Sequence, residues 1–167
     1  FEDKKKYSDR LKTARKLTGQ DDAVLIAKGK VQNIDLVAGS QDFRFIGGSF
    51  GAASGEAFIA GAQQAIANNL PYVFFSCSGG QRMMESSIAL MQMSRTTLAV
   101  NELKKNKIPY IVVLTNPTTV INFFKIIIIQ NTLLLFLINI LNTYILNTYI
   151  LNTYILLFKI LIKNDNK

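Results

Sequence analysis

The sequence contains no histidine, no tryptophan and only one cysteine among its 167 residues. Without an imidazole the chain has no Ser-His-Asp or Cys-His nucleophile relay and no zinc site with histidine ligands. A single cysteine excludes an internal disulfide and a thiolate metal cage. We therefore predict no metal site, and any catalysis has to rely on other groups.

Glycine and proline are absent from the last part of the chain, because all ten glycines and all three prolines lie within residues 1–119. Those residues carry 15 Lys and Arg against 10 Asp and Glu, which supplies +5 of the net charge of +8. No aromatic platform or recognition module accompanies this moderate charge, so we predict no nucleic-acid partner. We expect two parts, a folded domain over 1–119 and a tail over 120–167.

The positive charge of the domain is concentrated in residues 4–16, which include Arg10. A solvated helix face is one interpretation, and a contact with a phosphorylated ligand is the other. The chain starts at Phe1 with neither an initiator Met nor a signal peptide, so we expect a fragment of a longer protein.

Apolar periodicity predicts an α/β layer fold. Ser8 or Asp9 is placed to cap a first helix that Gly19 ends, and Asn33 is placed to turn the chain between two strands. Further helices are predicted over 52–69 and 82–104, and strands over 23–27, 34–38, 43–46, 72–75 and 110–114. The order β-β-β-α-β-α-β after the first helix is typical of a sheet with helical crossovers.

Two glycine-rich segments join a strand to a helix, and we call them the first glycine loop (residues 47–51, Gly-Gly-Ser-Phe-Gly) and the second glycine loop (residues 76–82, Ser-Cys-Ser-Gly-Gly-Gln-Arg). Backbone N–H groups at such junctions can approach a ligand at the positive end of a helix dipole. In the second loop, the N–H groups of Gly79 and Gly80 can converge on one oxygen that becomes negative during a reaction. A simple turn is the alternative for each loop.

Side chains of the second loop suggest further roles. Ser78 has no base beside it, so we expect its hydroxyl to cap a helix. Cys77 follows an apolar strand and is expected to be buried. Arg82 in a first helical turn opposes the dipole, which suggests an anionic ligand or a pairing with Glu85. The methionines are expected to fill the core: Met83, Met84, Met91 and Met93.

Several blocks, in order along residues 1–119, carry a family resemblance: Asp9-Arg10-Leu11-Lys12, Asp42-Phe43-Arg44-Phe45-Ile46-Gly47-Gly48-Ser49-Phe50-Gly51 with Gly55-Glu56, Ser76-Cys77-Ser78-Gly79-Gly80-Gln81-Arg82-Met83-Met84-Glu85, Leu90-Met91-Gln92-Met93 and Val113-Leu114-Thr115-Asn116-Pro117-Thr118-Thr119. They resemble the carboxyltransferase β subunit of bacterial acetyl-CoA carboxylase, of which they cover roughly the middle.

The resemblance implies the N-terminal half of a crotonase-like (ClpP/crotonase) spiral. It implies transfer of a carboxyl group from carboxybiotin to acetyl-CoA, giving malonyl-CoA for fatty-acid synthesis in the cytoplasm. The implied cofactor is biotin, and the implied partners are the carboxyltransferase α subunit, the biotin carboxyl carrier protein and biotin carboxylase. Zinc belongs only to a four-cysteine ribbon that precedes this region in the family.

The resemblance also implies roles for individual residues. The pair Gly79-Gly80 would serve an oxyanion, expected to be the thioester oxygen of acetyl-CoA, and biotin would take the methyl proton. The implied CoA-binding set is Gly47, Gly48, Ser49, Ser78, Arg82 and Arg10.

The tail, residues 120–167, differs in kind from the domain. Ile, Leu, Asn, Phe, Lys and Tyr occupy 41 of its 48 positions, and these are the amino acids that codons of A and T alone specify. Ile-Leu-Asn-Thr-Tyr repeats three times over 140–154, a period that gives no one-sided surface in a helix or a strand. We favour a shifted or mis-joined reading frame. A transmembrane helix over the uncharged residues 126–158 and a native soluble element are the alternatives.

Two classes of function remain. The first is an enzyme fragment that is inactive alone, either of acetyl-CoA carboxylase or of another acyl-CoA carboxylase such as one for propionyl-CoA. The second is a non-catalytic or membrane-attached fragment.

Overall fold

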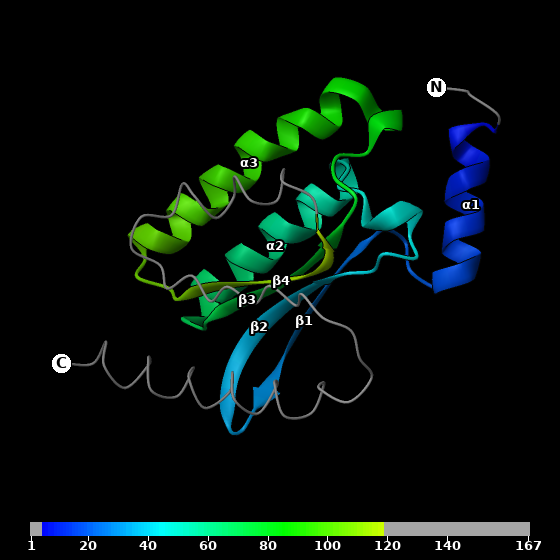
Figure 1. Cartoon of the computed structure of the whole chain (residues 1–167). Helices are drawn as coiled ribbons and strands as arrows, with labels where there is room; N and C mark the ends of the chain where they lie inside the picture. Colours follow the sequence, from blue (N-terminus) through cyan, green and yellow to red (C-terminus); the bar gives the residue numbers. More distant parts are fainter. Residues whose placement is uncertain (1–4, 119–167) are drawn as a thin grey trace.

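The structure is a computed structural model that describes residues 5–118. A four-stranded sheet in the order β1-β2-β3-β4 lies against helices α2 and α3 (Figure 1). The elements in chain order are α1 (Tyr7–Thr18), β1 (Val24–Val31), β2 (Ile34–Gln41), the 3-10 turn η1 (Ile46–Gly48), α2 (Ala52–Asn68), β3 (Tyr72–Ser78), the 3-10 turn η2 (Met83–Glu85), α3 (Ser86–Lys105) and β4 (Tyr110–Thr118). The predicted tail, including the segment 126–158, lies outside the described residues.

Strands β1 and β2 form an antiparallel hairpin, with Val31 opposite Ile34. The two residues between them, Gln32 and Asn33, have positive φ values of 47° and 68°. A two-residue turn of this kind matches the twist of the strands it joins. The predicted turn at Asn33 is confirmed.

The pairs β2–β3 and β3–β4 are both parallel, and each is connected through a helix. Figure 1 shows α2 and α3 on the same face of the sheet. Between these layers, Phe58 of α2 packs edge-on against Tyr72 and Phe74 of β3, with ring centroids 5.4 and 5.0 Å apart. The predicted α/β layer architecture is confirmed.

The predicted strand at 43–46 is wrong. The Asp42 carboxylate accepts the Arg44 N–H at 2.9 Å, and the Phe45 N–H donates to the Asp42 carbonyl at 3.1 Å. An aspartate that bonds the backbone two residues on favours a turn over a strand. The turn buries Phe45 completely, against Ala14 and Ala23.

Two predicted helix starts are also wrong. Helix α1 begins at Tyr7 after Lys6, with no side-chain cap, so neither Ser8 nor Asp9 caps it. The predicted end at Gly19 is confirmed by its left-handed conformation. Helix α3 begins at Ser86 rather than at residue 82, because 82–85 fold into a loop and the turn η2.

Two of the methionines expected in the core are exposed, Met83 at 77% and Met91 at 63%. The buried residues of α3 as far as Thr96 are small or polar, namely Ala89, Gln92 and Thr96. The apolar periodicity of the sequence therefore misassigned the buried face of this helix. Within residues 5–118, no helix is long and apolar enough to cross a membrane.

Candidate functional site

The two glycine loops lie side by side and are joined by three backbone hydrogen bonds. The Gly79 N–H donates to the Gly47 carbonyl at 2.8 Å, and the Phe50 N–H donates to the Gly80 carbonyl at 2.8 Å. The Arg82 N–H donates to the Phe50 carbonyl at 3.0 Å. The sequence predicted two separate junctions, and the structure combines them into one site where β3 ends and α2 begins.

Gly48 makes this close approach possible. Its φ is +62°, and a Cβ atom at this position would lie 2.1 Å from the Cys77 carbonyl oxygen. On the other side, the buried Gln41 donates its Nε2 to the Gly48 carbonyl at 3.1 Å and accepts the Ser76 hydroxyl at 2.8 Å. Only glycine fits this position, because backbone atoms occupy the space that a side chain would need.

The N–H groups of Gly79 and Gly80 have different acceptors in this structure. Gly79 donates to Gly47, as above, whereas Gly80 donates to the buried Ser78 hydroxyl at 3.0 Å. The Ser78 hydroxyl in turn donates to the Gly80 carbonyl at 3.2 Å, so it does not cap α3 as expected. The oxyanion role of the pair stays a prediction, and it requires a ligand oxygen to take the place of these acceptors.

Arg82 does not face a ligand, because its side chain is 0% exposed. Its guanidinium forms a bidentate ion pair with Asp22, at 2.6 and 2.8 Å, and a second ion pair with Glu85 at 3.2 Å. The expected contact with an anionic ligand is replaced by these two carboxylates. The pairing with Glu85 was one of the sequence alternatives. Asp22 was missed, because it lies 60 residues from its partner and no local pattern marks it.

The charges of this ion-pair group are fixed by their surroundings. Burial alone would raise the pKa of Asp22, but hydrogen bonds from Arg82, Ser54 and the backbone outweigh it and keep the pKa below its ordinary value. Burial alone would lower the pKa of Arg82, and the bonds to Asp22 and Tyr7 more than reverse that effect. Both groups therefore stay charged at neutral pH and are already paired, so neither is free to act as a general base.

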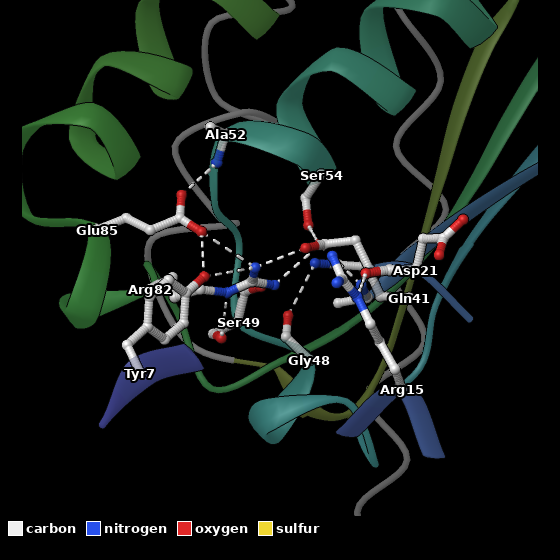
Figure 2. A network of polar contacts seen from close by, with 12 residues as sticks. Tyr7, Arg15, Asp21, Gln41, Gly48, Ser49, Ala52, Ser54, Arg82 and Glu85 are labelled. Carbon is white, nitrogen blue, oxygen red and sulfur yellow. Dashed lines mark hydrogen bonds and ion pairs between the residues drawn. The ribbon is translucent and has the colours of Figure 1, made fainter. Parts of the chain in front are cut away.

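Helix α1 closes one side of the group. The Tyr7 hydroxyl donates to Glu85 Oε1 at 2.5 Å, and the guanidinium of Arg82 contacts the same hydroxyl at 3.3 Å (Figure 2). Burial, and then the hydrogen bond to Glu85, raise the pKa of Tyr7. Arg10, predicted to contact CoA phosphates, lies half-buried on this helix.

Three further features, Cys77, possible metal ligands and a hollow between α2 and α3, add nothing to the site. Cys77 is half-buried rather than fully buried. Among residues 5–118, no group of His, Cys, Asp or Glu could hold a metal ion. A hollow of about 270 Å³ lies between α2 and α3; its lining is mainly apolar, with Gln63, Arg95 and Glu102 among its residues, and neither glycine loop contributes to it.

The sequence matches the carboxyl transferase domain family over residues 3–135. It is 57% identical over 118 residues to the acetyl-coenzyme A carboxylase carboxyl transferase subunit beta of Pelagibacter ubique (strain HTCC1062), covering 71% of this chain and 38% of the relative. The corresponding protein of Caulobacter vibrioides (strain NA1000 / CB15N) is 55% identical over 119 residues, covering 71% and 39%. The chain thus spans about two fifths of the length of these curated relatives.

Solved structures share the fold. The transcarboxylase 12S hexamer, solved with hydrolysed methylmalonyl-coenzyme A, superposes with a TM-score of 0.53 at 28% identity, covering 56% of this chain and 18% of that one. A Pseudomonas malonate decarboxylase hetero-dimer superposes with a TM-score of 0.53 at 24% identity, covering 58% and 44%. The second similarity supports the fold alone.

Proposed function

The chain belongs to the carboxyl transferase domain family, and we propose that it is the part of an acetyl-CoA carboxylase carboxyltransferase β subunit that serves the acyl-CoA substrate. The family named from the sequence blocks is confirmed, as is the crotonase-like α/β fold class. The reaction proposed is transfer of a carboxyl group from carboxybiotin to acetyl-CoA, giving malonyl-CoA for fatty-acid synthesis.

The observation that carries this proposal is the joining of the two glycine loops into one site. Each loop leads toward the N-terminal end of a helix, α2 or α3, where the helix dipole favours negative charge. Removing a methyl proton from acetyl-CoA places negative charge on the thioester oxygen. Backbone N–H donors beside that oxygen stabilise the resulting enolate, and an oxyanion donor of this kind contributes about 10²–10³-fold in rate.

The nearby side chains fit a reaction whose base lies outside this chain. The carboxylates that contact the second glycine loop through Arg82, Asp22 and Glu85, are both held in ion pairs with it, and the sequence has no histidine. Carboxybiotin, when bound, would supply the carboxyl group, and the ureido group freed by its departure would accept the methyl proton. This chain orients the thioester, and its backbone N–H groups stabilise the negative charge on the thioester oxygen by hydrogen bonding.

Ser78 then has a defined part in binding. Its hydroxyl oxygen accepts the Gly80 N–H at 3.0 Å, the bond that a thioester oxygen would need. We propose that the thioester oxygen displaces the Ser78 hydroxyl from Gly80 when acyl-CoA binds. Gly47, Gly48 and Ser49 would border the CoA moiety, and Arg10 would meet its phosphates.

The proposed partners are the α subunit of the carboxyltransferase, the biotin carboxyl carrier protein and biotin carboxylase, with the cytoplasm as the compartment. The names of the 57% and 55% identical relatives support the β-subunit assignment. We propose that the 167-residue chain is inactive alone, because it spans about two fifths of those relatives. The domain boundary at residue 119 stays a prediction.

The alternative substrate, propionyl-CoA or a similar acyl-CoA, has less support. The neighbour solved with hydrolysed methylmalonyl-coenzyme A is 28% identical, compared with 57% for the acetyl-coenzyme A carboxylase relative. No observation on the described residues favours a membrane-attached or purely non-catalytic role.

A chimeric enzyme tests the proposal. In it, residues 3–118 replace the matching segment of the Pelagibacter ubique β subunit, which is combined with the α subunit of that organism. We expect the chimera to form acetyl-CoA from malonyl-CoA when biotin is added, with the unmodified β subunit as a positive control. The 167-residue chain with the same α subunit should show no turnover. An inactive chimera that folds and assembles would refute the proposed function, and turnover by the 167-residue chain would refute its inactivity.

A further inference from the structure

The backbone of Arg82 is part of the second glycine loop, and its side chain bonds to Ser49 of the first. Its guanidinium donates to the Ser49 carbonyl at 2.8 Å, and its Nε donates to the Ser49 hydroxyl at 3.2 Å. Figure 2 shows the guanidinium lying between Ser49 and Glu85. These bonds span 33 residues of sequence and add to the backbone bonds between the loops.

The guanidinium cannot turn in its site. Asp22 accepts two of its hydrogen bonds, and Asp22 is itself fixed by the Ala23 N–H at 2.7 Å and by the Ser54 hydroxyl. The centroid of the Phe45 ring lies 5.4 Å from the guanidinium carbon. A planar fork with several donors fits this site, whereas a lysine ammonium, which is a single compact charge, does not.

The same group of charges also fixes the start of α2, which follows directly after the first loop. Glu85 Oε2 accepts the Ala52 N–H at 2.6 Å, and the Ser54 hydroxyl binds Asp22. A carboxylate at a helix N-terminus satisfies N–H groups that have no partner within the helix. The first glycine loop is therefore bound to the charged group at Ser49, and the residue that follows the loop, Ala52, is bound to it as well.

We propose that Arg82 is a positioning residue, which sets the direction of the Gly79 and Gly80 N–H groups by fixing the first glycine loop against the second. The link is direct, because Gly79 donates to Gly47 of the first loop and the Gly80 carbonyl accepts from Phe50. Its effect on catalysis rests on the proposed function. Buried ion pairs add little net stability compared with apolar packing, so geometry is the expected reason for a charge here.

Hydrogen exchange in the full 167-residue chain tests the positioning itself. The variant is Arg82→Lys, and the control is Arg95→Lys, the same change at an exposed ion pair with Glu56 on α2 and α3. The Gly79 and Phe50 amides report on the loops, and the Tyr72 amide, which donates to the Pro109 carbonyl, reports on the sheet. In R82K we expect the loop amides to lose about tenfold more protection than the sheet amide, and in R95K we expect no such difference.

Equal loss of protection at loop and sheet amides in R82K would overturn the proposal, because it would mean a role in global stability alone. If R82K does not fold, Ser49→Ala decides, since it removes one acceptor of Arg82 and leaves the ion pairs in place. We then expect loss of protection at the loop amides without loss at Tyr72, and an unchanged loop would overturn the proposal.

The chimeric enzyme tests the consequence for catalysis. With R82K we expect kcat to fall about tenfold or more, by a larger factor than any rise in the KM for malonyl-CoA, because the direction of the N–H donors matters most for the charge that develops on the oxygen during the reaction. If the loop amides of R82K lose protection but kcat is unchanged, the proposed effect of Arg82 on catalysis is overturned. If the unmodified chimera has no activity, the proposed function fails, and the exchange experiment still decides whether Arg82 positions the loops.

Discussion

Alanine at Gly48 is predicted to destabilise the chain much more than alanine at Gly47. The two glycines have nearly the same positive φ, +62° at Gly48 and +64° at Gly47. A residue with a Cβ atom costs about 1–2 kcal/mol in this left-handed region, and both substitutions carry that cost. They differ in their surroundings, because nothing lies within 4 Å of a Cβ at Gly47.

At Gly48 the added Cβ would lie 2.1 Å from the Cys77 carbonyl oxygen and 3.2 Å from the Ser78 Cα. Both are backbone atoms, so relief requires the two glycine loops to separate. Overpacking typically costs a further 1–3 kcal/mol, roughly, so Gly48→Ala should cost about 2–5 kcal/mol and Gly47→Ala about 1–2. The pair of variants isolates the contact between the loops.

Urea unfolding of the full chain, followed by far-UV circular dichroism because the sequence has no tryptophan, measures both costs. We expect a clearly lower midpoint for Gly48→Ala than for Gly47→Ala, at an unchanged slope. Equal midpoints for the two variants would mean that the loops do not approach each other as the structure describes.

Three further predictions concern the site and the tail. The pKa of Asp22 in the folded chain lies below its ordinary value of 3.8, so the contribution of Asp22 to stability is present above about pH 4 and is lost as the pH falls through the folded pKa. Asp22→Asn should therefore lower the free energy of unfolding at pH 7 by roughly 3 kcal/mol. It should also reduce the loss of stability between neutral and acid pH, the acid limb of a plot of stability against pH. An acid limb as steep as in the unmodified chain would contradict this. Ser78→Ala should lower the KM of the chimeric enzyme for malonyl-CoA, since it removes the acceptor that competes for the Gly80 N–H, whereas a raised KM would show that the hydroxyl binds substrate itself. Translating the other two reading frames beyond codon 119 should reveal a Gly-Gly segment that continues the family pattern, and its absence from both frames would count against the shifted frame.

Much of the fold could be predicted from the sequence because its signals are local. The Asn33 turn, the helix that follows Gly51 and the short apolar strand after Pro71 each depend on residues close in the chain. The predicted strand at 43–46 is wrong because local alternation alone favoured it. The Asp42 carboxylate accepts the Arg44 N–H and so stabilises a turn in its place.

The site was predicted only in part, because its organisation depends on distant contacts. The glycine loops were identified by their composition, but their union depends on backbone bonds between residues about 30 positions apart. Asp22 could not be found from local pattern, since an acidic residue before a strand is ordinary on a surface. The buried role of Arg82 follows from Asp22 and was therefore missed with it.

The most direct test of the account is the crystal structure of the chimeric enzyme with acetyl-CoA bound. The account predicts that the thioester oxygen lies within hydrogen-bond distance, about 2.7–3.2 Å, of the Gly79 or Gly80 nitrogen, and that the Ser78 hydroxyl has left Gly80. A thioester oxygen bound by other donors, with the Ser78 hydroxyl still on the Gly80 N–H, would contradict the central claim that these glycine loops serve the acyl-CoA oxygen.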